Sequence, residues 1–355
     1  MTTRRRFLKR SLAATGMLIA GGVATLLPRK ANAYYSGPIT DHFNGEQFFN
    51  PVGQSPRGPW QVARLYAAET WAVWPSYFPS PFPPDKPPVR VAGSRARIVL
   101  VGHASWLIQT GGRNILIDPV WAERASPVSF AGPIRANPPG IAFDDLPPID
   151  AVLVTHNHYD HMDSATLSRL WQRHRPQIVT PLGNDAIMRS DMPGLEAQAV
   201  DWGDLAEVAG LRVHTLPTQH WSARGARDRR HALWASFLIE SPAGKIYAIG
   251  DTGFGDGGTF RHVAEHHPGT RLALIPIGAY EPRWFMQGQH MNPADAVEAL
   301  RLCGAEMALG HHWGTFQLTT EPHDQPLADL QTARARAGMS NDRFQAMRPG
   351  QVFEI

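Results

Sequence analysis

Residues 151–162 read A-V-L-V-T-H-N-H-Y-D-H-M, an apolar run followed at once by a group of histidines and an aspartate. The run is short, rich in β-branched side chains and preceded by Pro147, Pro148 and Asp150, which is typical of a buried strand. A loop that leads from such a strand into a helix is where α/β proteins usually place their chemistry. This stretch therefore predicts an α/β fold with a functional loop after a buried strand.

The metal-capable side chains of the stretch are His156, His158, Asp160 and His161. In an extended chain, residues two apart face the same way, so His156 and His158 would point to one side. Zinc accepts imidazole and carboxylate ligands, and a single catalytic zinc takes three protein ligands and keeps one open position. Four ligands in so short a span predict the beginnings of two adjacent metal sites. A surface loop with solvated histidines is the alternative, which the spacing H-x-H-x-D-H after a strand disfavours.

A helix is predicted directly after the metal-capable loop. Asp163 or Ser164 can cap its first turn by accepting from free backbone N–H groups. Leu167, Leu170 and Trp171 recur at helical spacing and predict its buried face.

Residues 1–33 have the pattern of a twin-arginine export signal and are set apart from the fold. Residues 3–9 read T-R-R-R-F-L-K, and an apolar stretch rich in alanine and glycine follows over 12–27. The A-N-A at 31–33 predicts cleavage, a mature start near Tyr34 and a periplasmic protein. An uncleaved membrane anchor is the alternative, since the apolar stretch approaches the length that spans a bilayer.

The charge of the chain depends on this signal. The full chain carries +3, and residues 1–33 hold seven basic and no acidic residues, so 3 − 7 leaves −4 on the mature chain. A nucleic-acid partner therefore loses its main electrostatic support. The single cysteine, Cys303, cannot form an internal disulfide and lies in an apolar helical context that predicts a core position.

Residues 34–95 form an arm that is rich in aromatic residues and proline. Phe43, Phe48 and Phe49 come first, and further aromatic rings then alternate with prolines over 75–88. Such a segment is predicted to wrap a surface in extended form without regular structure. Its rings are interpreted as cover for one edge of the core, and the alternative is a wall that contacts lipid or a membrane interface.

Residues 96–355 show strands in runs with helices between them, and no break marks a second domain. This order fits one α/β domain with two packed sheets and outer helices. Strands are predicted at 98–101, 106–108, 115–117, 151–154, 177–179, 211–213, 235–238 and 246–249, and helices near 184–189, 292–302 and 327–337.

Three later stretches repeat the pattern of an apolar run followed by a metal-capable residue in a polar or glycine-rich turn. They contain His220 in T-Q-H-W-S, Asp251 in G-D-T-G and the doublet His311-His312 in G-H-H-W-G. Each alone is a weak signal, because an aspartate after a strand is more often a turn residue. Together they supply the ligands that two metal sites still lack.

The chain resembles the metallo-β-lactamase superfamily, which builds an αββα sandwich with its metals at one edge. Within it, the chain looks like the N-acyl-phosphatidylethanolamine-hydrolysing phospholipase D family and its bacterial relatives, from about Asp41 to the C-terminus. The motifs that carry the resemblance are G-H-A at 102–104, T-H-N-H-Y-D-H at 155–161, I-G-A-Y-E-P-R-W-F-M at 277–286, Q-H-M-N-P at 289–293 and H-W-G-T-F at 312–316.

The resemblance implies a ligand set for two zinc ions per chain. One zinc would be bound by His156, His158 and His220. The second would be bound by Asp160, His161 and His312, with Asp251 bridging both. His312 is favoured over His311 because the family's ligand directly precedes W-G-T-F. His103 and His290 are expected near the metals, as hydrogen-bond donors behind the ligands or as substrate contacts, and core roles are the alternative.

The function implied is hydrolysis of a phospholipid phosphodiester, N-acylphosphatidylethanolamine above all, by a hydroxide held between the zincs, with Asp251 or Asp160 accepting a proton. An exported lactonase or carboxylic esterase is one alternative, and a non-catalytic zinc- or lipid-binding protein is another. The acidic mature chain disfavours a nuclease, and the histidine after Asp160 together with the missing cysteine ligand disfavours a β-lactamase. Expected partners are a phospholipid or other small ester, a peripheral membrane contact and, as in relatives, a second copy of the chain.

Overall fold

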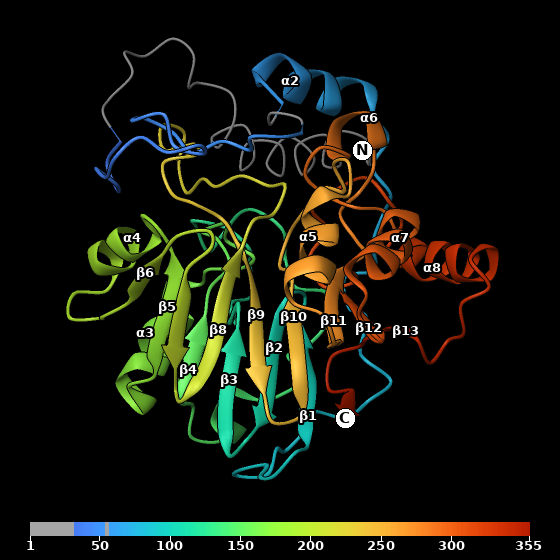
Figure 1. The fold of residues 1–355 in the computed structure, drawn as a ribbon. Helices are drawn as coiled ribbons and strands as arrows, with labels where there is room; N and C mark the ends of the chain where they lie inside the picture. The colour runs from blue at the N-terminus through green and yellow to red at the C-terminus, as the bar shows by residue number, and fades with distance from the viewer. Residues whose placement is uncertain (1–31, 54–56) are drawn as a thin grey trace.

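The computed structural model describes residues 32–53 and 57–355, which form two packed β-sheets with helices on both outer faces (Figure 1). The αββα sandwich in a single domain, predicted from the sequence, is confirmed. Residues 1–31 of the predicted export signal lie outside the described residues, so that signal remains a prediction. Within the described residues, no helix combines the length and the apolar character needed to cross a bilayer.

The first sheet holds seven strands, antiparallel from β14 to β3 and parallel from β3 to β6. Its order is β14 (Val352–Glu354), β1 (Ala96–Gly102), β2 (Ser105–Thr110), β3 (Arg113–Ile117), β4 (Ala151–Leu153), β5 (Gln177–Pro181) and β6 (Gln198–Val200).

The second sheet also holds seven strands, parallel from β13 to β10 and antiparallel from β10 to β7. Its order is β13 (Phe344–Ala346), β12 (Met307–His311), β11 (Thr270–Pro276), β10 (Gly244–Ala248), β9 (Ser236–Ser241), β8 (Leu211–Leu216) and β7 (Leu205–Val208).

Helices cover the outer face of each sheet and the end of the sandwich that carries the metal-capable loops (Figure 1). The first sheet is covered by α3 (Ser164–His174) and α4 (Asn184–Asp191), and the second by α5 (Gly258–His266), α7 (Pro293–Cys303) and α8 (Gln325–Arg336). The remaining short elements are α2 (Pro59–Ala68), α6 (Arg283–Met286) and the 3-10 turn η1 (Phe143–Asp145).

The core lies in three apolar layers, because successive residues of a strand face opposite sides. In β1, Ile98 and Leu100 point between the sheets, whereas Val99 and Val101 point toward α3 and α4. All seven residues of β1 are buried. Strands covered on both faces read as continuous apolar runs rather than as alternating patterns, which is why they were recognisable in the sequence.

Several local predictions are confirmed. Helix α3 follows Asp163, whose side chain accepts from the N–H groups of Ala165 and Thr166 at 3.1 and 3.2 Å. Leu167 and Leu170 are fully buried on its inner face. Cys303, at the end of α7, is 1% exposed and belongs to the core. The strands β6, β7, β11, β13 and β14 were not predicted, and all of these except β11 have only three or four residues, which carry too little periodicity to be recognised without their partners.

The arm divides into a buried part and an exposed part. Phe43 and Phe48 are at most 1% exposed and pack against Trp234, in agreement with rings that cover the core. Trp60 and Tyr77, by contrast, are 80% and 64% exposed. The prediction of an arm without regular structure is wrong for α2, because residues 60–68 lack proline and contain alanine and leucine, which favour a helix.

Candidate metal centre

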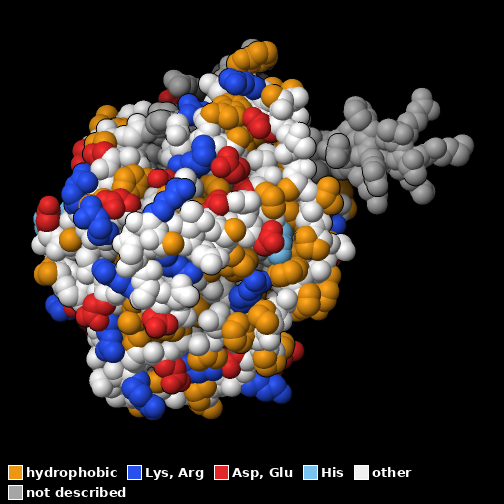
Figure 2. Space-filling view, turned by 90° about the vertical axis from the view of Figure 1, so that its right-hand side faces the viewer, with side chains coloured by type: hydrophobic (Ala, Val, Ile, Leu, Met, Phe, Trp, Pro, Cys, Tyr) orange, Lys and Arg blue, Asp and Glu red, His pale blue; other side chains and the backbone are white. Residues whose placement is uncertain are grey.

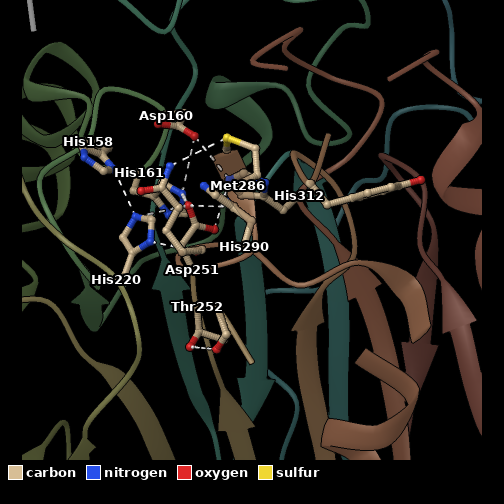
Figure 3. A network of polar contacts seen from close by, with 12 residues as sticks. His158, Asp160, His161, His220, Asp251, Thr252, Met286, His290 and His312 are labelled. Carbon is tan, nitrogen blue, oxygen red and sulfur yellow. Dashed lines mark hydrogen bonds and ion pairs between the residues drawn. The ribbon is translucent and has the colours of Figure 1, made fainter. Parts of the chain in front are cut away.

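The predicted metal-capable residues meet at one edge of the sandwich, in loops that follow strands. His103 follows β1, His220 follows β8 and Asp251 follows β10, while the T-H-N-H-Y-D-H loop follows β4. His312 stands directly after β12. Figure 3 shows Asp251 between His220 on one side and His312 on the other. Side chains separated by more than 150 residues therefore form one buried polar centre.

The first cluster consists of His156, His158, His220 and Asp251, whose ligand atoms all lie within 4.8 Å of one another. Nδ1 of His158 lies 2.9 Å from Nε2 of His156 and 3.2 Å from Nε2 of His220. Ligand atoms bound to one tetrahedral zinc at about 2.0–2.1 Å are roughly 3.3 Å apart. The three imidazole nitrogens thus have the spacing that a zinc ion requires.

The second cluster consists of His103, Asp160, His161 and His312. Oδ2 of Asp160 lies 3.5 Å from Nε2 of His161 and 3.3 Å from Nε2 of His312. His103 is nearer still, with its Nε2 2.9 Å from the same carboxylate oxygen. The cluster offers two imidazoles and a carboxylate to an ion, with His103 bonded to the carboxylate from behind or available as a further ligand.

Asp251 joins the two clusters. Its Oδ2 lies 3.7 Å from Nε2 of His220 and 3.2 Å from Nε2 of His161, and its Oδ1 lies 3.0 Å from Nε2 of His312. Gly250 allows this placement: it has φ of +66°, and a Cβ there would meet the Thr155 side chain at 2.8 Å. A carboxylate that faces imidazoles of both clusters has the geometry of a bridging ligand.

Unpaired polar atoms support a cation at this centre. Nε2 of His161, Nε2 of His312 and Oδ1 of Asp251 are buried, and among the described residues they lie 3.0–3.2 Å from opposite charges without the geometry of a hydrogen bond. Buried polar atoms in proteins are nearly always hydrogen-bonded, so three that converge without such bonds require another explanation. Metal ligation satisfies all three atoms at once, and the donor set of imidazole and carboxylate suits zinc.

The first cluster is electrostatically ready for a cation. Burial lowers the pKa of His158 to about 3, and repulsion from His220 acts in the same direction. Burial also lowers the pKa of His220 to about 4, against the attraction of Asp251. These imidazoles are therefore neutral at pH 7, the form in which histidine binds metals.

The second cluster holds protons that a cation would replace. Burial lowers the pKa of His312, but attraction to Asp251 and the contact with the Asp160 carboxylate at 3.3 Å outweigh it and raise the pKa to about 9. For His161 as well, neighbouring carboxylates outweigh burial and raise the pKa well above its usual value. Metal binding here must release protons, so metal affinity falls as the pH is lowered.

Asp118 is a supporting residue that the sequence analysis did not identify as part of the site. It follows β3 and is completely buried. Its carboxylate accepts from the N–H and the hydroxyl of Thr155 and lies 2.7 Å from Nδ1 of His161. Such a contact fixes the orientation of the imidazole and leaves Nε2 free for a metal. The signal was present in the sequence, since I-L-I-D repeats the pattern of a strand followed by a carboxylate.

His290 reaches the centre from the loop between α6 and α7. Its Nδ1 lies 3.9 Å from Oδ2 of Asp251, and Asp251, His290 and His312 form a third group of possible ligands. The arm also contributes, because Asn50 donates from Nδ2 to the carbonyl of His220 at 3.0 Å. Nothing in the sequence around Asn50 indicated this contact, which depends on a sequence separation of 170 residues.

The doublet is divided by the fold. His312 belongs to the second cluster, whereas His311 is the last residue of β12 and lies edge-on to Trp106, with ring centroids 5.6 Å apart. Trp106 belongs to the core between the sheets. The structure thus places the seven predicted ligands together, with His103 and His290 beside them and His311 outside the groups of possible ligands among the described residues.

Comparison with known proteins agrees with this geometry. A family model for a β-lactamase superfamily domain matches residues 113–313. An N-acyl-phosphatidylethanolamine-hydrolysing phospholipase D of Caenorhabditis elegans is 38% identical, with 72% of this chain and 74% of that protein covered. A metal-dependent hydrolase of Opitutus terrae is 27% identical over 73% of this chain and its own full length.

A similar fold also occurs among solved structures. An isothiocyanate hydrolase from Delia radicum gut bacteria matches with a TM-score of 0.56 and 18% identity, covering 72% of this chain and 98% of that one. At this identity the similarity concerns the fold alone.

Proposed function

Since this chain belongs to the metallo-β-lactamase superfamily and is a metal-dependent hydrolase, we propose that it cleaves a phosphodiester bond of a phospholipid with two zinc ions. The proposed substrate is N-acylphosphatidylethanolamine, and the products are phosphatidic acid and an N-acylethanolamine. The observation that carries the proposal is the pair of His/Asp clusters joined by Asp251. The Caenorhabditis elegans relative, named for this reaction, supports the choice of substrate.

Two zinc ions bound here would polarise the phosphoryl group and lower the pKa of a water molecule. In the proposal, one ion would be held by His156, His158 and His220, and the other by Asp160, His161 and His312, with Asp251 as a ligand shared by the two sites. Catalytic zinc sites keep an open position, which in the proposal would take the hydrolytic water.

The residues around the ligands have separate tasks in the proposed reaction. His103 holds the Asp160 carboxylate from behind, at 2.9 Å. Asp160 or Asp251 accepts the proton of the attacking water. His290 is 7% exposed, and its buried Nδ1 has no hydrogen-bond partner among the described residues; in the proposal its imidazole contacts a substrate oxygen.

Apolar side chains beside the centre suit a lipid substrate. Met286 of α6 lies next to the metal-capable residues in Figure 3. It packs in one cluster with Leu65 of α2 and with Phe285, and Val62 and Trp284 flank that cluster. Acyl chains released from a bilayer need such a surface to remain out of water.

We further propose that α2 faces a membrane surface while the substrate enters. Trp60 at its start is 80% exposed, and Val73 beyond its end is 89% exposed. Figure 2 shows hydrophobic side chains at the top of the molecule, the end at which Figure 1 places α2. Exposed tryptophan is typical of the interface between water and lipid. Export to the periplasm, proposed from the first 33 residues, would bring the enzyme to such a surface.

The proposed function is tested with mature, zinc-loaded protein, mixed micelles of N-acylphosphatidylethanolamine and a panel of lactones and carboxylic esters. We expect phosphatidic acid and N-acylethanolamine to be released, a chelator to stop their release and added zinc to restore it. Turnover of a lactone or carboxylic ester without any phospholipid turnover would replace the proposal by an esterase. Firmly bound zinc without activity on any substrate would indicate a binding protein.

The two histidines of the doublet are expected to respond differently to alanine substitution. His312→Ala should remove one of two bound metals and lower the rate by at least about 100-fold, because it deletes a proposed ligand. His311→Ala should keep both metals and lower only the melting temperature, because His311 is buried against Trp106. Metal analysis and melting curves of the two variants test this difference. Metal loss in His311→Ala alone would make His311, rather than His312, the metal ligand.

A further inference from the structure

The segment 287–291, between α6 and α7, carries His290 to the proposed reaction centre. The His290 ring lies 5.2 Å from the ring of His220 and 5.4 Å from that of His312, measured between centroids. Its Nδ1 makes no hydrogen bond among the described residues. No hydrogen bond of Nδ1 fixes this imidazole, so its position depends on the backbone of segment 287–291 and on the packing of the ring.

The backbone of the segment is held from two sides. On the metal side, Nδ1 of His220 lies 3.0 Å from the carbonyl oxygen of Gln289, to which it can donate. On the outer side, Nη1 of Arg283 donates to the carbonyl of His290 at 3.0 Å. Two neighbouring carbonyls are thus bonded from opposite sides, one by a proposed metal ligand and one by an arginine outside the metal centre.

Arg283 is held through both its backbone and its guanidinium group. Its backbone N–H donates to Oε2 of Glu281 at 2.9 Å, and its Nη2 donates to Oδ2 of Asp295 at 2.7 Å. Asp295 belongs to the capping box that starts α7, where it pairs with Asn292. The guanidinium therefore connects the start of α6, the His290 carbonyl and the start of α7.

This arrangement requires the shape of arginine. A planar guanidinium presents several N–H groups in a fixed fork, so it can donate to a carbonyl and a carboxylate at once. The Arg283 and Asp295 side chains are 28% and 26% exposed, and an ion pair so close to solvent adds little to overall stability. The consequence of the contact therefore lies in the placement of His290 rather than in the stability of the fold.

We infer that Arg283 is a positioning residue for the hydrolysis proposed above: it holds segment 287–291 so that His290 faces Asp251 and the reacting phosphate. A displacement of about 1 Å at a reaction centre can lower a rate about 100-fold, so the carbonyl contact has a measurable effect although Arg283 is not among the metal ligands. The inference concerns how His290 is placed and rests on the proposed function only for the role of His290.

The first test is a double-mutant cycle on the metal-loaded enzyme, with whichever ester the wild type hydrolyses. We expect Arg283→Gln to lower kcat about 10- to 100-fold, with little change in KM and with the metal content of the wild type. If Arg283 acts through His290, adding Arg283→Gln to His290→Ala should lower kcat little further. A double variant whose loss in kcat equals the product of the two single losses would overturn the inference.

Two further variants separate positioning from general damage. Arg283→Lys can make one of the two contacts and should recover part of kcat. Arg301→Gln is the matched control, because Arg301 pairs with a carboxylate of α7, Glu298, as Arg283 pairs with Asp295 of α7, but is 68% exposed on the helix surface. We expect the control to have wild-type kcat. A loss in the control as large as in Arg283→Gln would assign the effect to α7 as a whole.

The second test needs no substrate, so it remains decisive if the proposed function is wrong. The amides of Gln289 and His290 donate to the carbonyl of Met286, each at 2.9 Å, and are protected from hydrogen exchange by these bonds. In metal-loaded Arg283→Gln we expect them to exchange about tenfold faster than in the wild type and in Arg301→Gln. Unchanged exchange would show that Arg283 does not hold the segment.

Discussion

Asp251→Ala is expected to abolish most of the activity, with a loss of about 1,000-fold or more in kcat/KM, and to lower the metal content of the purified protein. The reason is its position, since its carboxylate faces Nε2 of His220, His161 and His312. Removing it takes a shared negative charge from both proposed ions and leaves buried imidazoles without their counter-charge. Metal analysis by mass spectrometry and steady-state kinetics on the same preparation measure both effects.

Two companion variants sharpen this result. Asp251→Asn keeps the shape of the side chain and removes its charge. If it loses as much activity and metal as Asp251→Ala, the effect belongs to the charge. Asp256→Ala is the control, because this aspartate lies in the same connection but is exposed, and among the described residues its side chain accepts only from the N–H of Gly258. Asp251→Ala with its full metal content and undiminished turnover would exclude Asp251 from the metal site.

Asp118→Ala is expected to act on the fold and on the metal together. The carboxylate is fully buried and accepts two hydrogen bonds from Thr155, while His161 lies against it. Its loss would leave buried donors unsatisfied, which costs about 3–5 kcal/mol in the free energy of unfolding. Loss of the group that orients His161 should also weaken metal affinity about 10- to 100-fold.

Urea unfolding of metal-free protein and metal competition with a chromogenic chelator measure the two effects of Asp118→Ala separately. Thr180→Val is the matched control, because it removes one buried hydroxyl bond, to the carbonyl of Val154, and keeps the side-chain shape. We expect it to cost about 1 kcal/mol in unfolding and to leave metal affinity nearly unchanged. If Asp118→Ala is no less stable and no weaker in metal binding than this control, Asp118 does not support the centre.

Local signals in the sequence were sufficient for the elements that begin the site. The apolar run of β4, the spacing of His156, His158, Asp160 and His161 and the cap of α3 at Asp163 all lie within a few residues of one another. Periodicity and capping act over such short distances, so they can be recognised without tertiary structure. The family resemblance then indicated His220, Asp251 and His312, and the structure brings these residues together.

Other parts of the molecule depended on contacts between distant segments. The arm was predicted without a helix, yet its Asn50 bonds to the His220 carbonyl and α2 packs on α6. Asp118 had the form of an ordinary turn residue until the pairing of β3 with β4 brought it to Thr155 and His161.

Hydrophobic periodicity and ligand spacing are local properties, so the sequence alone indicated an α/β domain of two packed sheets with a metal-capable loop after a buried strand. The family resemblance implied the αββα sandwich and the hydrolase. The resemblance already favoured His312 as the ligand, but only the tertiary structure placed His311 against Trp106 and the Arg283 guanidinium on the carbonyl of His290. The pairing of distant strands and the packing of their connecting loops determine which side chains meet, and no short stretch of sequence contains that information.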